Sequence, residues 1–277
     1  IVHIHDACFK VNPKWYSFKF KLWYKIMIPR VIKKAKRITT NSNHSRNDLM
    51  KFYNISLEKM SLLYWGVEET FFSRKKLDHP LNGKDFILYV GSIEPRKNLG
   101  ALIEAFKLIR LDPHFKDLQL ILIGGTNKIF AKQDLIDQDL NLAIHIEGFL
   151  PDDKLLAYYR HAKILVYPSL YEGFGLPPLE AMASLTPVIA ENNSSLPEVI
   201  GEAGLLLDKL SPKSLTQAVK TLLQDKNLYK DLVLKGFKRV ESFNWHKSAR
   251  EMISVFYEVN GQRKTQDYKT PVENSLP

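Results

Sequence analysis

Short apolar runs alternate with segments of helical periodicity along most of this chain. Between residues 84 and 242 the apolar runs lie at 85–90, 118–123, 142–146, 163–167, 187–190 and 204–207. Continuous runs of this length are typical of strands that are buried on both faces of a parallel sheet. Segments with helical periodicity follow three of these runs, at 99–111, 151–160 and 211–223. The alternation predicts an α/β fold with a doubly wound parallel sheet for residues 84–242.

A shorter and similar pattern lies before this region. Strands are expected at 1–4, 37–40 and 60–65, and Ser45 is placed to cap a helix that follows it. By itself, the pattern of residues 1–72 predicts a Rossmann-like half on the N-terminal side.

The remaining segments connect or extend these two domains. The polar stretch 73–83 contains Pro, Asn and Gly and is the expected linker. Two further helices are expected over 227–259, and residues 243–260 are expected to pack back toward the first domain. The tail 261–277 has few apolar residues and is predicted to be disordered.

The composition narrows the class of protein. The chain has 277 residues, of which 45% are hydrophobic and 25% charged, which suits two globular domains. No run approaches the roughly 20 apolar residues that span a bilayer. The single cysteine, Cys8, excludes an internal disulfide and fits a reducing compartment such as the cytoplasm. No G-x-G-x-x-G follows a predicted strand, which disfavours a dinucleotide-dependent oxidoreductase.

The net charge of +10 is concentrated in the first third of the chain. Residues 1–83 hold 16 Lys and Arg against 6 Asp and Glu, whereas residues 84–277 hold 24 of each. Residues 7–47 contain no acid, and ten bases lie between residues 10 and 37 among Trp, Tyr and Phe.

Three interpretations of residues 10–37 are open. Bases and aromatic rings on a helix suit an anionic membrane surface, where the rings lie at headgroup depth and the cations pair with phosphates. Nucleic acid fits the same composition. The structural alternative is a helix whose aromatic side chains belong to the core and whose lysines are solvated. We predict the membrane surface, and no nucleic-acid partner.

The densest chemistry lies in residues 167–184, which follow the predicted strand at 163–167. Glu172 lies in a loop with Gly173 and Gly175, two prolines then begin a helix, and Glu180 falls in its opening turns. Open α/β sheets bind ligands at the carboxyl ends of their strands, and a helix N-terminus favours phosphate. The pattern predicts an anion site flanked by two carboxylates.

Three motifs resemble those of one family. The sequence E-G-F-G-L-P-P-L-E, in which seven residues separate Glu172 from Glu180, resembles the signature of group 1 (family 4) retaining glycosyltransferases with the two-domain GT-B fold. The loop G-S-I-E-P-R-K-N at 91–98 resembles a second motif of that family. The segments 35–49 and 65–72 resemble the later part of its acceptor domain.

The resemblance implies two Rossmann-like domains and transfer from a nucleotide-diphosphate sugar, without a metal or another cofactor. It also implies that roughly the first hundred residues of the acceptor domain are lacking, so that residues 1–72 would be a partial, incomplete Rossmann-like domain.

The resemblance further implies roles for single residues. Lys97 and Arg96 would neutralise the diphosphate, with Arg96 supplying the guanidinium that many relatives carry at the position of Ser92. Glu172 would contact hydroxyls of the donor sugar, and Glu180 would contact the ribose. From the first domain, His5 would face either the outer hydroxyl of the donor sugar or the reaction centre. The other expected donor-binding positions are Gly91, Ser92, Gly124, Gly125, Phe149, Leu150, Gly173, Phe174, Gly175 and Leu176.

The resulting prediction is a retaining, metal-independent hexosyltransferase. The phrase H-D…N-P-K-W-Y-S at 5–17 resembles mannosyl- and rhamnosyltransferases of bacterial surface polysaccharide assembly. GDP-mannose is the first donor expected, and a lipid-linked oligosaccharide is the expected acceptor. The expected location is cytoplasmic and peripheral, at the inner face of the membrane. The alternative is an incomplete or non-catalytic relative that binds only nucleotide sugar or a partner protein.

Overall fold

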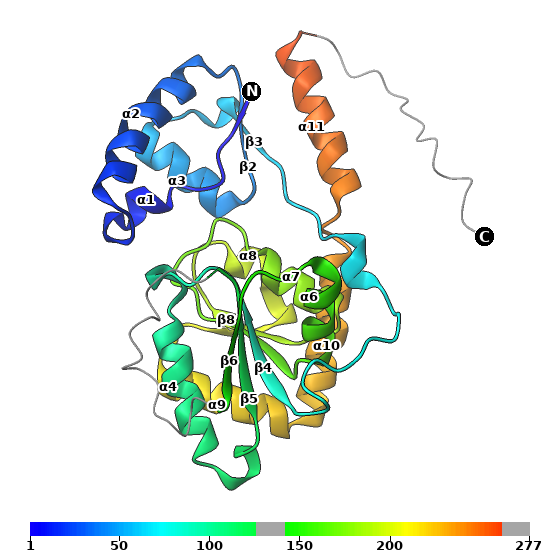
Figure 1. Ribbon diagram of the computed structural model, residues 1–277. Helices are drawn as coiled ribbons and strands as arrows, with labels where there is room; N and C mark the ends of the chain where they lie inside the picture. Colours follow the sequence, from blue (N-terminus) through cyan, green and yellow to red (C-terminus); the bar gives the residue numbers. More distant parts are fainter. Residues whose placement is uncertain (126–141, 262–277) are drawn as a thin grey trace, which may run out of the picture.

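The computed structural model describes residues 1–125 and 142–261, which form two α/β domains (Figure 1). The first domain contains a parallel sheet in the order β1-β2-β3, formed by Val2–His3, Ile38–Thr40 and Met60–Leu62. The second contains a parallel sheet in the order β6-β5-β4-β7-β8-β9. The α/β class and the parallel sheets are confirmed.

The six strands of the larger sheet follow the apolar runs of the sequence. They are β4 (Phe86–Val90), β5 (Gln119–Ile123), β6 (Ile144–Glu147), β7 (Ile164–Tyr167), β8 (Val188–Glu191) and β9 (Leu205–Leu207). Every residue of β4, β5 and β7 is buried, because these strands lie in the middle of the sheet between two layers of helices.

The strand order reverses between β4 and β7. The chain runs outward from β4 through β5 to β6, and then from β7 through β8 to β9 on the other side. Right-handed crossovers in opposite directions place helices on opposite faces of the sheet. The gap that this reversal leaves, at the carboxyl ends of β4 and β7, is the usual ligand position of a doubly wound sheet.

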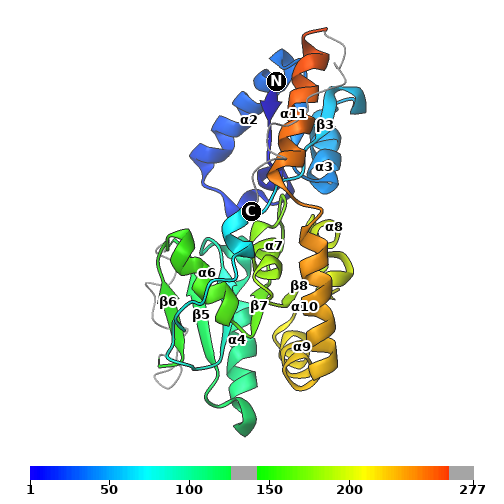
Figure 2. The same cartoon turned by 90° about the vertical axis from the view of Figure 1, so that its right-hand side faces the viewer.

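Helices cover both faces of the larger sheet (Figure 2). Helix α4 (Leu99–Arg110) packs against α9 (Pro212–Gln224), and α7 (Leu176–Ala183) packs against α10 (Lys226–Val240) and α6 (Asp152–His161). The short helix α8 is Leu196–Ile200. Ser211 caps α9 through a capping box, as its Ser-Pro sequence predicts. Short 3-10 turns occur at Pro13–Trp15, Leu57–Lys59, Glu69–Phe72, Pro95–Lys97, Pro113–Phe115 and Gly201–Ala203.

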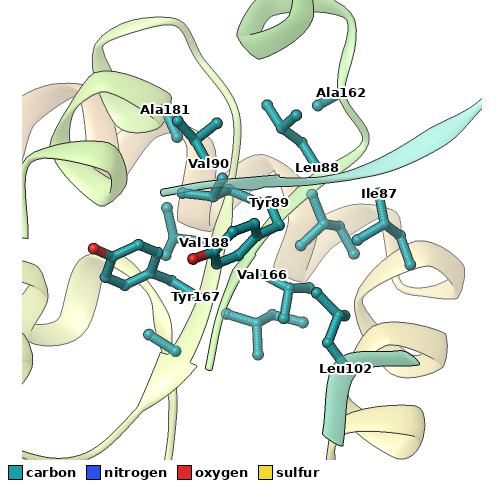
Figure 3. Packing of buried hydrophobic residues seen from close by; sticks show 14 of the residues in the cluster. Ile87, Leu88, Tyr89, Val90, Leu102, Ala162, Val166, Tyr167, Ala181 and Val188 are labelled. Carbon is teal, nitrogen blue, oxygen red and sulfur yellow. The ribbon is translucent and has the colours of Figure 1, made fainter. Parts of the chain in front are cut away.

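The core of the second domain has two tyrosines at its centre. Tyr89 of β4 and Tyr167 of β7 stack with ring centroids 6.4 Å apart, and their hydroxyl groups point to the same side (Figure 3). Aliphatic side chains of both strands surround them, so each ring is buried while its hydroxyl reaches the sheet's carboxyl edge, where Tyr89 donates to the carbonyl of Ser92.

The first domain corrects two details of the sequence prediction. Its helices are α1 (Cys8–Val11), α2 (Phe18–Lys34) and α3 (Asn43–Tyr53). Ser42, not Ser45, caps α3, because Ser42 has extended backbone and its Oγ accepts from the Ser45 N–H (3.0 Å). The helix therefore begins three residues earlier than predicted. Strand β3 ends at Leu62 instead of residue 65.

The last described helix leaves the second domain and lies beside the first in both views (Figures 1 and 2). This helix, α11 (Trp245–Val259), makes an ion pair between Glu258 and Arg37 at 3.0 Å. Ser248 Oγ also donates to the carbonyl of Tyr64. No helix in residues 1–125 or 142–261 combines the length and apolarity needed to cross a membrane. The predicted tail lies outside the described residues, apart from Gly261.

Candidate active site

A cavity of about 280 Å³ lies between the two domains. From the first domain it is lined by His5, Asp6, Asn41 and Trp65. From the second it is lined by Gly91, Arg96, Lys97, Tyr167, Glu172, Gly173, Phe174, Gly175, Leu176 and Pro177. Nine of the positions predicted from the sequence therefore meet in one cavity, at the carboxyl ends of β4 and β7.

A buried charge cluster forms the floor of the second domain's half. Glu172 Oε1 lies 2.5 Å from Lys97 Nζ, and Oε2 lies 3.1 Å from Arg96 Nη1. The side chains of Lys97 and Glu172 are only 6% and 9% exposed. Tyr167 OH also accepts from Lys97 Nζ (3.0 Å), and Arg96 Nη1 donates to the carbonyl of Tyr171 (2.9 Å). Two cations thus share one carboxylate.

Local backbone geometry places both cations. The 3-10 turn Pro95–Lys97 follows β4 and ends at Asn98, whose φ of 54° lies in the left-handed region. Asparagine tolerates this conformation better than most residues, so the chain can turn sharply into α4. As a result, Arg96 and Lys97 face β7 instead of solvent, with Lys97 5% exposed.

The electrostatics of the cluster favour an ionised carboxylate. Burial opposes the charged form of Glu172, but Lys97 and Arg96 outweigh it, so the pKa of Glu172 is lowered. Burial lowers the pKa of Lys97, and Glu172 acts against that effect. Burial also acts against the charge of Arg96, yet Glu172 raises the pKa of its guanidinium on balance. Arg96 Nη2 also lies 3.6 Å from Glu94 Oε2, so the two cations are balanced by two carboxylates. Arg96 and Lys97 are the positive groups that line the cavity, where an anionic ligand could bind.

Gly173 has a structural requirement besides any contact with a ligand. A Cβ at this position would lie 2.9 Å from Asp6 Oδ2 and 3.1 Å from the carbonyl oxygen of His5. Glycine therefore permits the first domain to approach the Glu172 loop. At Gly175, φ is 122°, and α7 begins directly after it with Pro177 and Pro178 in the first turn.

Glu180 lies on α7 but does not line the cavity. Tyr159 OH donates to its Oε2 (2.6 Å). Burial raises the pKa of Glu180 to about 7, and the hydrogen bond from Tyr159 only partly offsets this effect. The carboxyl group is therefore poised to change its protonation state near neutral pH.

Five other predicted residues, Ser92, Gly124, Gly125, Phe149 and Leu150, also lie outside the cavity lining. Gly124 has φ 149°, and a Cβ there would lie 1.9 Å from the carbonyl oxygen of Gly91, so it permits the ends of β4 and β5 to meet. Phe149 is 90% exposed after β6. The expected contact of these residues with a nucleotide stays a prediction.

Sequence reasoning missed five of the lining residues: Asp6, Asn41, Trp65, Tyr167 and Pro177. Asp6 follows His5 directly, and burial raises the pKa of its carboxyl group. The Trp65 ring lies 5.1 Å from that of His5, edge to face. A usable signal existed, because Asn41 and Trp65 both follow strands whose carboxyl ends meet at one edge.

Within residues 1–125 and 142–261, no three His, Cys, Asp or Glu side chains are grouped so that they could hold a metal ion.

Two α/β domains, each with a parallel sheet, face each other across the cavity. A cluster of buried charged side chains lies at the switch point of the larger sheet. This arrangement defines a GT-B architecture. Residues 71–239 match the family model described as glycosyl transferases group 1. The chain belongs to this family.

Two curated relatives are similar over most of this chain. The chain is 27% identical over 268 residues to the O-antigen chain mannosyltransferase B of Escherichia coli, covering 92% of this chain and 69% of that protein. It is 30% identical over 226 residues to the O-antigen chain mannosyltransferase RfbU of Salmonella typhimurium, covering 80% of this chain and 60% of that protein.

Solved structures support the fold. A sucrose-phosphate synthase from Thermosynechococcus elongatus superimposes with a TM-score of 0.75 at 24% identity, covering 94% of this chain and 68% of that one. The Anabaena protein HepE, solved in complex with UDP and glucose, gives a TM-score of 0.74 at 18% identity, covering 92% and 70%.

Proposed function

We propose that this chain is a retaining, metal-independent hexosyltransferase of surface polysaccharide biosynthesis. Its donor would be a nucleotide-diphosphate sugar, with GDP-mannose as the first candidate, and its acceptor a lipid-linked oligosaccharide. The observation that carries the proposal is the buried Lys97–Glu172–Arg96 cluster in the interdomain cavity. Membership of the glycosyl transferase family, the two mannosyltransferase relatives and the UDP complex of HepE support it.

The cluster suits a leaving diphosphate. Arg96 and Lys97 lie next to each other in the cavity, so two cations are available for the negative charge that develops on the leaving group. Buried cations act in a low effective dielectric and need no reorganisation when the reaction occurs. Arg96 and Lys97 would bind phosphate oxygens, and Glu172 would then be free to accept hydrogen bonds from sugar hydroxyls.

The first domain would close the reaction centre. His5 and Asp6 line the same cavity as Glu172, from the opposite domain. His5 would face the donor sugar, and the acceptor hydroxyl would attack the anomeric carbon on the face from which the diphosphate leaves. The hydroxyl proton would pass to the departing phosphate. Because attack and departure occur on the same face, the anomeric configuration would be unchanged.

The proposal is tested in two steps. The first is thermal unfolding of the chain with GDP, UDP, dTDP and their sugars, where a ligand at 100 times its dissociation constant should stabilise the fold by about 2.7 kcal/mol. The second is transfer to a lipid-linked acceptor in the presence of EDTA, with the anomeric configuration of the product read by NMR. Nucleotide binding without transfer would favour the non-catalytic alternative.

A membrane surface is proposed as the partner of α2. Its residues Phe18, Leu22, Trp23 and Ile26 are 75%, 48%, 62% and 43% exposed, and they form one apolar stripe. Exposed bases also lie on α2, at positions 19, 25, 30, 33 and 34. Each base near an anionic bilayer contributes on the order of 1 kcal/mol.

The structure divides the aromatic residues of this region into two groups. The rings of Tyr16, Phe20 and Tyr24 stack on one another, and Phe9 packs edge to face on Tyr24. These rings belong to internal packing, as the structural alternative expected. Of the aromatic side chains of α2, Phe18 and Trp23 remain on the exposed stripe, beside Leu22 and Ile26.

Sedimentation with vesicles tests the membrane proposal. The chain should bind vesicles that contain phosphatidylglycerol. Binding should weaken in 0.5 M salt, because the Debye length falls from about 8 Å at physiological ionic strength toward about 3 Å at 1 M. A variant with Phe18→Ser and Trp23→Ser should lose binding, whereas Leu111→Ser, at an apolar site 79% exposed in the second domain, should not. Equal binding by all three proteins would refute the assignment.

A further inference from the structure

One carboxylate of the second domain accepts its hydrogen bonds, among the described residues, from donors across the domain interface. Glu198 Oε1 accepts from the Asn43 N–H (2.8 Å), from Asn43 Nδ2 (2.7 Å) and from Tyr64 OH (2.6 Å). Its Oε2 accepts from the His44 N–H (3.2 Å). Glu198 belongs to α8, which faces the first domain (Figure 1), and all its donors belong to that first domain.

These donors include the beginning of α3. Asn43 and His44 are the first two residues of the helix, so their N–H groups have no partner within it. The cap Ser42 satisfies only the Ser45 N–H, and the first turn of α3 contains no acid. A carboxylate at this end is favoured by the free N–H groups and by the helix dipole. Glu198 therefore supplies from the other domain the anion that α3 lacks.

The same end of α3 is bonded to the loop that carries Glu172. Ser42 Oγ and Ser45 Oγ both donate to the carbonyl of Gly173, at 2.7 and 3.1 Å. Asn41, in the amide orientation that satisfies both of its polar atoms, donates to the carbonyls of Gly173 (3.2 Å) and His5 (2.9 Å). A continuous set of hydrogen bonds thus runs from the α3 N-terminus to both walls of the cavity.

Glu198 itself is held rigidly on its own domain. Arg239 of α10 donates from Nε to the carbonyl of Val199 (3.0 Å) and from Nη2 to the carbonyl of Glu198 (2.5 Å). These bonds fix the backbone of α8 on the second domain. The carboxylate can therefore act as a fixed point against which the first domain is placed.

We infer that Glu198 is a positioning residue, which caps α3 across the interface and so holds the His5 side of the cavity against the Glu172 loop. The inference deepens the proposed function, on which its kinetic part rests. Glu198 does not line the cavity and touches no reacting group. It acts on the population of the closed arrangement, in which both walls of the cavity are assembled.

The test compares Glu198→Ala and Glu198→Gln in the full chain, with Glu202→Gln as the matched control. Glu202 is an exposed carboxylate four residues later, with no interdomain hydrogen bond described. Hydrogen exchange of the Asn43 and His44 amides should be at least about tenfold faster in Glu198→Ala, because a hydrogen bond to a charged group shifts an equilibrium by about 10- to 100-fold. Exchange in β4 and β5 should not change.

Steady-state kinetics give the second readout. In Glu198→Ala, kcat should fall about tenfold or more, while the affinity for nucleotide, whose predicted contacts lie mainly in the second domain, should stay within about twofold. Glu198→Gln should recover part of both losses, because its carbonyl oxygen can still accept at the Oε1 position. Glu202→Gln should match the wild type.

Two results would overturn the inference. One is wild-type exchange of the Asn43 and His44 amides in Glu198→Ala. The other is a loss of nucleotide affinity that parallels the loss of kcat, which would mean that Glu198 supports the second domain alone. If the wild-type chain transferred no sugar, the proposed function would fail, and the exchange measurement would still decide the role of Glu198.

Discussion

Replacement of Glu172 by Gln tests the buried charge cluster most directly. The substitution keeps the shape of the side chain but removes a carboxylate that lies 2.5 Å from Lys97 Nζ and 3.1 Å from Arg96 Nη1. Both cations are poorly exposed, with 6% and 16% of their side-chain surface accessible. The variant therefore leaves the buried Lys97 without a carboxylate contact and Arg96 with Glu94 alone, at 3.6 Å.

The expected loss of stability follows from this geometry. Removing one partner of a buried ion pair costs about 3–5 kcal/mol. Gln can still accept a hydrogen bond, and Lys97 can lose its proton, so we expect about 2–3 kcal/mol. For a domain of this size, that corresponds to a decrease in Tm of roughly 5–10 °C. Typical domains have about 5–15 kcal/mol of stability, so the fold should persist.

Urea unfolding measures this loss, with Glu104→Gln as the control. Glu104 pairs with Lys107 at 2.8 Å, but its side chain is 51% exposed, and the pair should contribute no more than about 0.5 kcal/mol. Adding Lys97→Met to Glu172→Gln should cost less than the sum of the two single changes, because the double variant no longer buries an unpaired ammonium. Additive losses would refute the reasoning.

The pH dependence provides an independent check. The pKa of Lys97 is lowered in the folded chain, so between that value and the unfolded value of 10.5 the unfolded state binds more protons. Stability contributed by this group therefore rises with pH in that window. The deficit of Glu172→Gln should shrink as the pH rises toward 10.5, and a constant deficit would contradict the account. Transfer activity should fall about 10²–10³-fold at every pH.

Three further predictions concern single residues. Arg96→Ala should abolish most turnover while leaving the fold intact, and an unchanged kcat would remove Arg96 from the proposed mechanism. Burial raises the folded-state pKa of Glu180 to about 7, above the unfolded value of 4.5. The stability that this group contributes is therefore present below pH 4.5 and is lost as the pH rises through 7. The free energy of unfolding of Glu180→Gln should lack this pH-dependent contribution. If the ionised carboxylate binds ribose, nucleotide affinity should rise through pH 7 in the wild type only, as titration calorimetry would measure. Gly124→Ala should destabilise the second domain by more than about 1 kcal/mol, because φ is 149° and the new Cβ would meet the carbonyl of Gly91; equal chemical denaturation midpoints would contradict this.

Much of the fold could be predicted because its signals are local. The apolar runs that became β4, β5 and β7 are continuous, since central parallel strands are buried on both faces. Where two local signals were equivalent, the prediction failed. Ser42 and Ser45 both suit a helix cap, and only the extended backbone of Ser42, set by the strand before it, decides between them.

The helix α2 illustrates a different limit. Its composition predicts bases and aromatic rings on one element, but composition does not say which rings face the protein. The neighbour Phe9 and the stacked rings of Tyr16, Phe20 and Tyr24 form one packed group, which leaves Phe18 and Trp23 exposed. That division depends on which side of the helix contacts the rest of the first domain.

The sequence by itself determined the α/β class, the position of the glycine-rich loop after β7, and the presence of Arg96, Lys97 and Glu172 at strand ends. These features depend on periodicity and on turn chemistry within a few residues. The tertiary structure alone decided that Lys97 and Glu172, 75 positions apart, form a buried pair, and that Glu198 caps a helix 155 positions earlier. Such contacts depend on strand order and domain placement, which bring distant residues together without leaving a local pattern in the sequence.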